Sequence, residues 1–195
     1  MKYTLRRGFT LVELVIVVAV IAILATIVSV LYVNVQEQAR DTKLRDAGSK
    51  VAGAIQLFYS KYERMPRGGS GSTAAIGSGT ECADGANGWF AKGTHGASGC
   101  TVEDTLVASG YLPVGFSDSL PKNTLYLPTS TPNLSIMIYT PPAAGKVMVF
   151  YTLEAATSKD TAAFNTQLTR CGYTPADPIS QRDSYGMRGG VCADL

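Results

Sequence analysis

Hydrophobic positions along this chain first run without a break and then form a one-sided pattern. The segment Phe9–Val33 has 25 residues, and Glu13 is its only charged side chain. A helix of that length reaches roughly 37 Å at about 1.5 Å per residue, enough to cross a bilayer core of about 30 Å. The pattern therefore predicts a membrane-spanning helix over residues 9–34 that carries one ionisable group.

The next segment predicts an amphipathic continuation of the same helix over residues 35–66. Apolar residues recur there at steps of three and four, which is typical of a helix with one buried face. Charged side chains, Asp41 among them, fill much of the remaining surface, and Pro66 disfavours helical backbone at Met65 and should end the helix. The apolar stripe contains Leu44, Ala47, Val51, Ala54, Ile55, Leu57, Phe58 and Tyr62.

Residues 67–195 are expected to form a globular head that covers this stripe. Gly68–Gly99 is rich in Gly, Ser and Ala, which predicts a surface loop. A sharper alternative is an exposed loop at a subunit contact, with Trp89 and Phe90 as its apolar anchor. Thr101 and Asp104 then predict the capping box of a short helix, which Gly110 closes.

Strand signals follow in the second half of the head. Thr124–Leu127, Leu134–Tyr139 and Lys146–Leu153 are rich in branched and aromatic residues, which favours strands. An antiparallel sheet of three or four strands with the long helix on one face gives an α+β fold. The pattern leaves open which alternating set faces the helix: Ile136, Ile138, Val147, Val149 and Tyr151, or the residues between them.

A short basic leader precedes the apolar segment. Lys2, Arg6 and Arg7 favour a cytoplasmic location for this end. An ordinary secretory signal is cut after its apolar stretch, but here that stretch is long and has no A-x-A-type site. Cleavage between Gly8 and Phe9 would instead keep the apolar helix and expose a new amine one helical turn from Glu13. A carboxylate in apolar surroundings needs such a cation.

The run Arg7-Gly8-Phe9-Thr10-Leu11-Val12-Glu13 resembles the class III leader and N-terminal helix of type IV pilins and type II secretion pseudopilins. The resemblance covers roughly residues 1–66. It implies a prepilin peptidase that cuts after Gly8 and methylates the amine of Phe9. It also implies that Glu13 pairs with the Phe9 amine of a neighbouring copy as a filament grows from an assembly platform in the membrane. Many members have helix-weakening Gly and Pro where this chain has Ala22 and Val30.

The resemblance implies a structural role, with alternatives left open. The expected protein is a subunit of a type IV pilus-like filament, single-pass in the cytoplasmic membrane as a precursor and extracellular after assembly. One alternative is a pseudopilin of a type II secretion system. Another is a minor pilin or competence subunit that binds DNA or a surface ligand. A signal anchor with an incidental Glu13 would share the hydropathy.

Charge argues against a broad nucleic-acid surface. The whole chain has a net charge of +2, from 17 basic and 15 acidic side chains. Removal of Lys2, Arg6 and Arg7 leaves 14 basic against 15 acidic side chains, so the mature chain is almost neutral. Nucleic acid is therefore not an expected partner, although a small local patch stays compatible with this balance.

Four cysteines, Cys82, Cys100, Cys171 and Cys192, all fall in the part expected to be exported. An even number there predicts disulfides, with three connectivities allowed. We favour the local pairs Cys82–Cys100 and Cys171–Cys192, each of which would stabilise the head by roughly 3 kcal/mol in the loop-entropy model. The second pair would resemble the disulfide-bounded C-terminal loop of many type IV pilins.

Metal and catalytic chemistry find little support, so no enzyme and no cofactor is expected. The chain lacks C-x-x-C, and its single histidine, His95, lies in a Gly-rich loop, which disfavours zinc. A nucleophilic pair of His95 with Cys82 or Cys100 is disfavoured because those thiols should be oxidised. Some pseudopilins use a late loop for calcium, and the acids available for that are Asp160, Asp177 and Asp183. Their spacing lacks a dense set of oxygen ligands, so we expect solvated loop acids.

Overall fold

The computed structural model describes residues 10–66, 88–90, 101–121, 135–141, 143–174 and 185–195. The chain divides into two compact units, Met1–Gln38 and Ala39–Leu195. Several predicted features lie outside the described residues: Gly8, Phe9, Cys82, Cys100, His95, Asp177, Asp183 and the strand Thr124–Leu127.

The first helix, α1 (Leu11–Tyr62), has 52 residues and confirms one long helix across the two predicted segments. It ends earlier than expected. The N–H of Glu63 still donates a helical hydrogen bond to the carbonyl of Tyr59 at 2.8 Å. The backbone of Glu63 itself is left-handed, with a φ of 52°. This conformation is uncommon for a residue other than glycine, and it stops the helix at Tyr62, three residues before Met65. The turn at Glu63, rather than the restriction imposed by Pro66, therefore sets the helix end.

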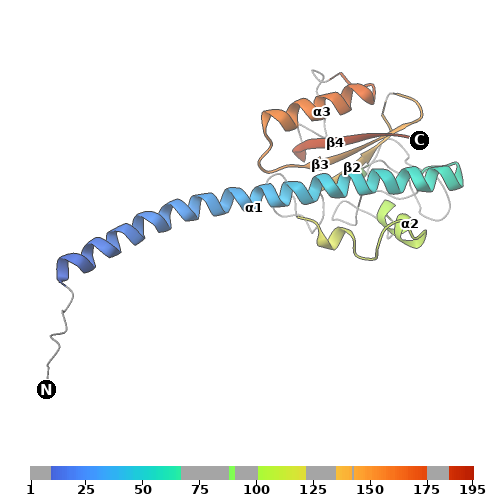
Figure 1. The fold of residues 1–195 in the computed structure, drawn as a ribbon. Helices are drawn as coiled ribbons and strands as arrows, with labels where there is room; N and C mark the ends of the chain where they lie inside the picture. The colour runs from blue at the N-terminus through green and yellow to red at the C-terminus, as the bar shows by residue number, and fades with distance from the viewer. Residues whose placement is uncertain (1–9, 67–87, 91–100, 122–134, 142, 175–184) are drawn as a thin grey trace. The chain divides into compact units, whose positions relative to one another are not determined.

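Among the described residues, the head forms a four-stranded antiparallel sheet in the order β1-β2-β3-β4. The strands are β1 (Gly88–Trp89), β2 (Ile136–Tyr139), β3 (Lys146–Thr152) and β4 (Met187–Asp194) (Figure 1). The predicted hairpin of β2 and β3 is confirmed. Sequence reasoning wrongly placed β1 and β4 in loops, because a two-residue strand and a strand with two adjacent glycines carry weak local signals.

Both faces of the sheet are covered, not one. Ile136, Ile138, Val147, Val149 and Tyr151 lie in the cluster that includes the buried stripe of α1, which settles the parity that the sequence left open. The residues between them form a second cluster beneath α3 (Ser158–Arg170), opposite α1 in Figure 1. The sequence analysis missed α3 because only two of its side chains, Phe164 and Leu168, are buried. Most of that helix is polar.

The predicted stripe of α1 is largely confirmed. Its members Leu44, Ala47, Val51, Ala54, Ile55 and Phe58 are between 0 and 4% exposed. Leu57 was assigned to the stripe wrongly, since 58% of it is exposed. It lies two residues from Ile55, a rotation of about 200° that turns it to the opposite side. Tyr62 is 40% exposed, and its ring centroid lies 4.5 Å from that of Phe58.

Asp41 is buried, which corrects its assignment to the charged surface. The side chain is 1% exposed and accepts hydrogen bonds from the backbone N–H groups of Glu154 (2.8 Å) and Ala155 (3.0 Å). Its neighbour Arg40 forms an ion pair with Glu154 at 3.3 Å. These contacts join α1 to the turn that follows β3, so the carboxylate of Asp41 is a structural acceptor and not a solvated charge.

The short helix α2 (Val102–Ala108) begins as the sequence predicted, with a capping box between Thr101 and Asp104. A 3₁₀ turn, η1 (Ser117–Ser119), follows it. Phe90 is 1% exposed, and its ring centroid lies 5.9 Å from that of Phe116. Phe90 therefore anchors the interior of its own head, and its proposed role at a subunit contact is wrong.

Candidate functional site

The candidate site begins at the start of α1, where Thr10 and Glu13 form a reciprocal pair. Oε2 of Glu13 accepts hydrogen bonds from the backbone N–H of Thr10 (2.8 Å) and from its hydroxyl (2.8 Å). The hydroxyl oxygen of Thr10 in turn accepts the N–H of Glu13 at 3.2 Å. This is a capping box, in which two backbone donors at a helix start find side-chain acceptors.

The capping box fixes the carboxylate of Glu13 at the positive end of the helix dipole. All of its hydrogen bonds to Thr10 use Oε2, and within the described part of the chain Oε1 accepts none. The carboxylate is exposed in the single subunit. One carboxylate oxygen thus holds the helix start.

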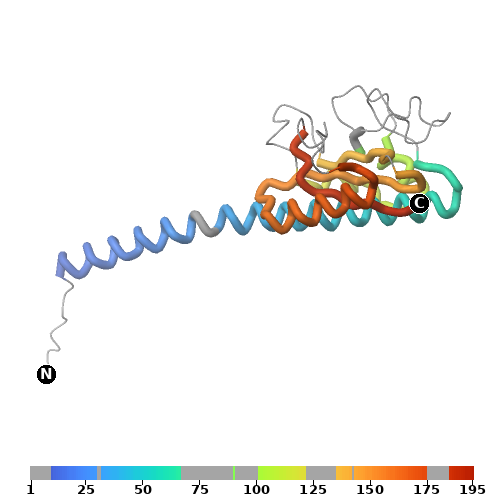
Figure 2. Tube along the Cα trace, turned by 90° about the horizontal axis from the view of Figure 1, so that it is seen from above, coloured from blue at the N-terminus to red at the C-terminus, as the bar shows by residue number. Residues whose placement is uncertain are grey.

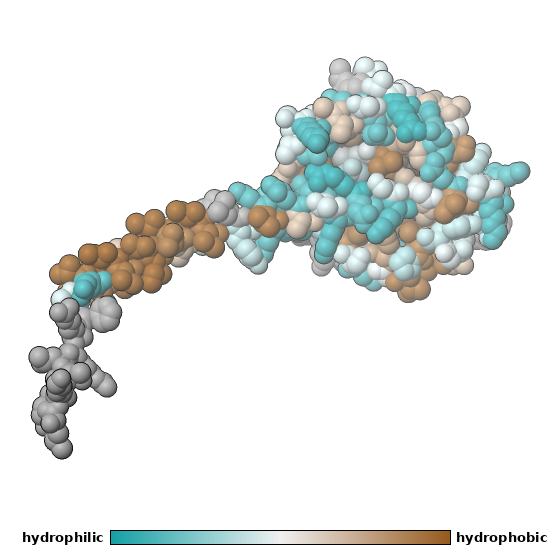
Figure 3. All heavy atoms as spheres, viewed as in Figure 1, coloured by the Kyte–Doolittle hydropathy of each residue, from teal (hydrophilic) through white to brown (hydrophobic). Residues whose placement is uncertain are grey.

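An unbroken apolar surface follows Glu13. The Thr26 hydroxyl bonds the carbonyls of Ile23 (2.7 Å) and Ala22 (3.2 Å), and that of Ser29 bonds the carbonyl of Ala25 (2.8 Å), so these polar groups are satisfied within the helix. Figure 3 shows apolar side chains over this part of α1. The exposed ones include Leu11, Val12, Leu14, Val15, Ile16, Val17, Val18, Val20, Ile21, Ile23, Leu24, Ile27 and Val28.

The same part of α1 meets the length and composition of a membrane span. Its most apolar 18-residue window has a mean hydropathy of 3.2 and is 0% buried within the molecule. Among the described residues, α1 is the one helix that meets this criterion. Exposed apolar surface of this extent marks a region that contacts lipid or protein.

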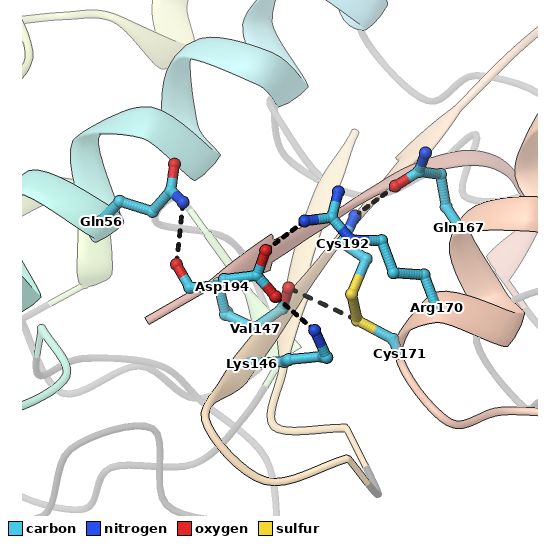
Figure 4. The surroundings of a disulfide bond; sticks show 8 residues. All are labelled: Gln56, Lys146, Val147, Gln167, Arg170, Cys171, Cys192 and Asp194. Carbon is cyan, nitrogen blue, oxygen red and sulfur yellow. Dashed lines mark hydrogen bonds and ion pairs between the residues drawn. A yellow bond between two sulfur atoms is a disulfide. The ribbon is translucent and has the colours of Figure 1, made fainter.

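A disulfide joins Cys171 at the end of α3 to Cys192 in β4, with an S–S distance of 2.04 Å, so that predicted pair is confirmed (Figure 4). Close by, the carboxylate of Asp194 binds both Lys146 and Arg170. The hydrogen bonds from Lys146 and then Arg170 hold the pKa of Asp194 below its ordinary value. These contacts hold β4 against β3 and α3 (Figure 2). The sequence analysis had treated β4 as part of the disulfide-bounded loop.

Asp160 lies in helix α3 and not in a loop, which corrects its assignment as a solvated loop acid. It forms a capping box with Thr157, and its Oδ1 accepts a hydrogen bond from Arg45 of α1 at 2.9 Å. Burial opposes the ionisation of Asp160, but the hydrogen bonds from Thr157 and the charge of Arg45 outweigh it, so its pKa lies below the ordinary value. Among the described residues, no group of three metal-ligating side chains occurs. The other two acids considered for calcium lie outside them.

The sequence analysis missed two polar residues that organise α1. The capping partner of Glu13, Thr10, had a readable signal, because Thr-x-x-Glu before an apolar run is the capping-box spacing. Asp41 had none, because its hydrogen-bond donors come from a turn more than 110 positions later. Of the predicted site residues, the structure thus places Glu13 at the helix start and joins Cys171 to Cys192.

Comparison with known protein families identifies the start of the chain. Residues 4–29 match the family model of the prokaryotic N-terminal methylation motif. No curated protein and no solved structure gave a significant match. The matched residues include Gly8, Phe9, the Thr10–Glu13 capping box and most of the exposed apolar surface. The chain therefore carries a type IV pilin-like class III leader with a prokaryotic N-terminal methylation motif.

Proposed function

We propose that this chain is a structural subunit of a type IV pilus-like filament. The observation that carries the proposal is the exposed apolar surface of α1, which directly follows the methylation motif and contains a single carboxylate at its start. In the membrane, lipid covers this surface. In the filament, the same surface of other copies replaces the lipid, and the heads lie outside.

The precursor is processed before assembly. A prepilin peptidase cuts after Gly8 and methylates the amine of Phe9, and an assembly platform in the membrane adds the subunit to the fibre. The protein is then a single-pass protein of the cytoplasmic membrane as a precursor and extracellular as a filament. The methylation-motif family is structural, and this role needs neither catalysis nor a cofactor.

Glu13 sets the axial register of the filament. In the core its carboxylate pairs with the Phe9 amine of a neighbouring copy, while Thr10 continues to hold the other oxygen. A subunit in the wrong register would leave that carboxylate buried and unpaired. Removal of one partner from a buried ion pair costs about 3–5 kcal/mol, which strongly disfavours the wrong register.

Replacement of Glu13 by glutamine tests this role. The new amide side chain would keep the capping box, because glutamine serves at this position as glutamate does, but it removes the charge. Glu13→Gln should therefore insert normally and lower the yield of sheared fibres by at least about tenfold, close to the loss in Glu13→Ala. Glu37→Gln, at the next acid along α1, is the matched control. Normal fibre yield in Glu13→Gln would contradict the register mechanism.

Processing is tested by Gly8→Leu. This variant should stay uncut and keep its basic leader, visible by mass spectrometry as a chain heavier by the eight leader residues and without methylation. Removal of the leader from the variant would contradict cleavage after Gly8.

The pilin is favoured over a pseudopilin or a minor subunit by one feature. The Cys171–Cys192 disulfide resembles the bond that closes the C-terminal region of many type IV pilins. Immunogold labelling of the head on intact cells separates these functions. Abundant long fibres are expected, whereas an absence of labelled fibres outside the cell would favour the alternatives.

A further inference from the structure

We draw no further inference here: the strongest candidate, the pocket of about 360 Å³ between α1, α3 and β4, has its two charged wall residues, Arg45 and Asp160, paired with each other, and nothing in the structure shows what occupies it.

Discussion

The first and second halves of α1 differ in what surrounds them, although they belong to one helix. In the first half, large apolar side chains are 50–79% exposed on all sides. In the second half, the stripe from Leu44 to Phe58 is 0–4% exposed against the sheet, and charged residues occupy the other side. A helix that is apolar all round needs a surrounding apolar medium, whereas a one-sided helix needs one partner and water.

This difference separates two sources of free energy. The second half stabilises the head of its own chain, so substitutions there should change the free energy of unfolding. Among the described residues, the first half packs against no other element. Substitutions there should therefore change membrane insertion and filament assembly while the head stays folded.

The largest effect should come from removing a buried ring of the second half. Phe58→Ala should lower the free energy of unfolding of the head by about 3–5 kcal/mol, because a fully buried aromatic side chain is lost. Val18→Ala, in the exposed first half, should change it by no more than about 0.5 kcal/mol. Denaturant titration of the full chain in detergent, followed by near-UV circular dichroism, measures both. Equal losses would break the division between the halves.

Asp41→Ala should have the next largest effect. It leaves the N–H groups of Glu154 and Ala155 without their acceptor, at a cost of about 2–4 kcal/mol in the same titration. Asp46→Ala is the control, because its carboxylate is exposed and pairs only with Lys50, an interaction worth about 0.3–0.5 kcal/mol. A loss in Asp41→Ala as small as that of the control would show that the two hydrogen bonds of Asp41 are dispensable.

A pair of helix glycines sharpens the comparison further. A Cβ on Gly48 would lie 2.5 Å from the ring of Tyr151, whereas one on Gly53 would meet nothing within 4 Å. Gly53→Ala should therefore stabilise the head by about 1 kcal/mol through helix propensity. Gly48→Ala should be less stable than Gly53→Ala by about 1–3 kcal/mol because of overpacking. Thermal unfolding midpoints measure the difference. Equal midpoints would mean that the ring of Tyr151 moves aside without loss of stability.

The smallest effect should be a change in acid sensitivity. The pKa of Asp160 is lower in the folded head than in the unfolded chain, so its contribution is present above the ordinary aspartate pKa near 4. That contribution is lost as the pH falls through the lower folded value. Asp160→Asn should therefore show a shallower loss of stability than the parent chain below about pH 4. An unchanged dependence of stability on pH would show that the ion pair with Arg45 contributes nothing to the stability of the head.

Much of α1 and little of the sheet could be predicted from the sequence. The stripe of α1 was readable because helical periodicity is a local property, and the cysteine at 171 found its expected partner at 192. Helix α3 and strand β4 were missed because their hydrophobic patterns are weak: two buried side chains in one, and adjacent glycines in the other. Their positions follow from packing on the far face of the sheet, which no local window contains.

At the candidate site, the motif and the lone charge of Glu13 came from the sequence, and the structure added the bond to Thr10. The sequence by itself determined which segment is apolar all round, where its single carboxylate lies and which face of the helix is buried, since all three depend on neighbours within a few turns. Only the tertiary structure decided the parity of the sheet and the burial of Asp41. Each of these depends on which distant backbone groups meet, and that is fixed by the packing of the whole head.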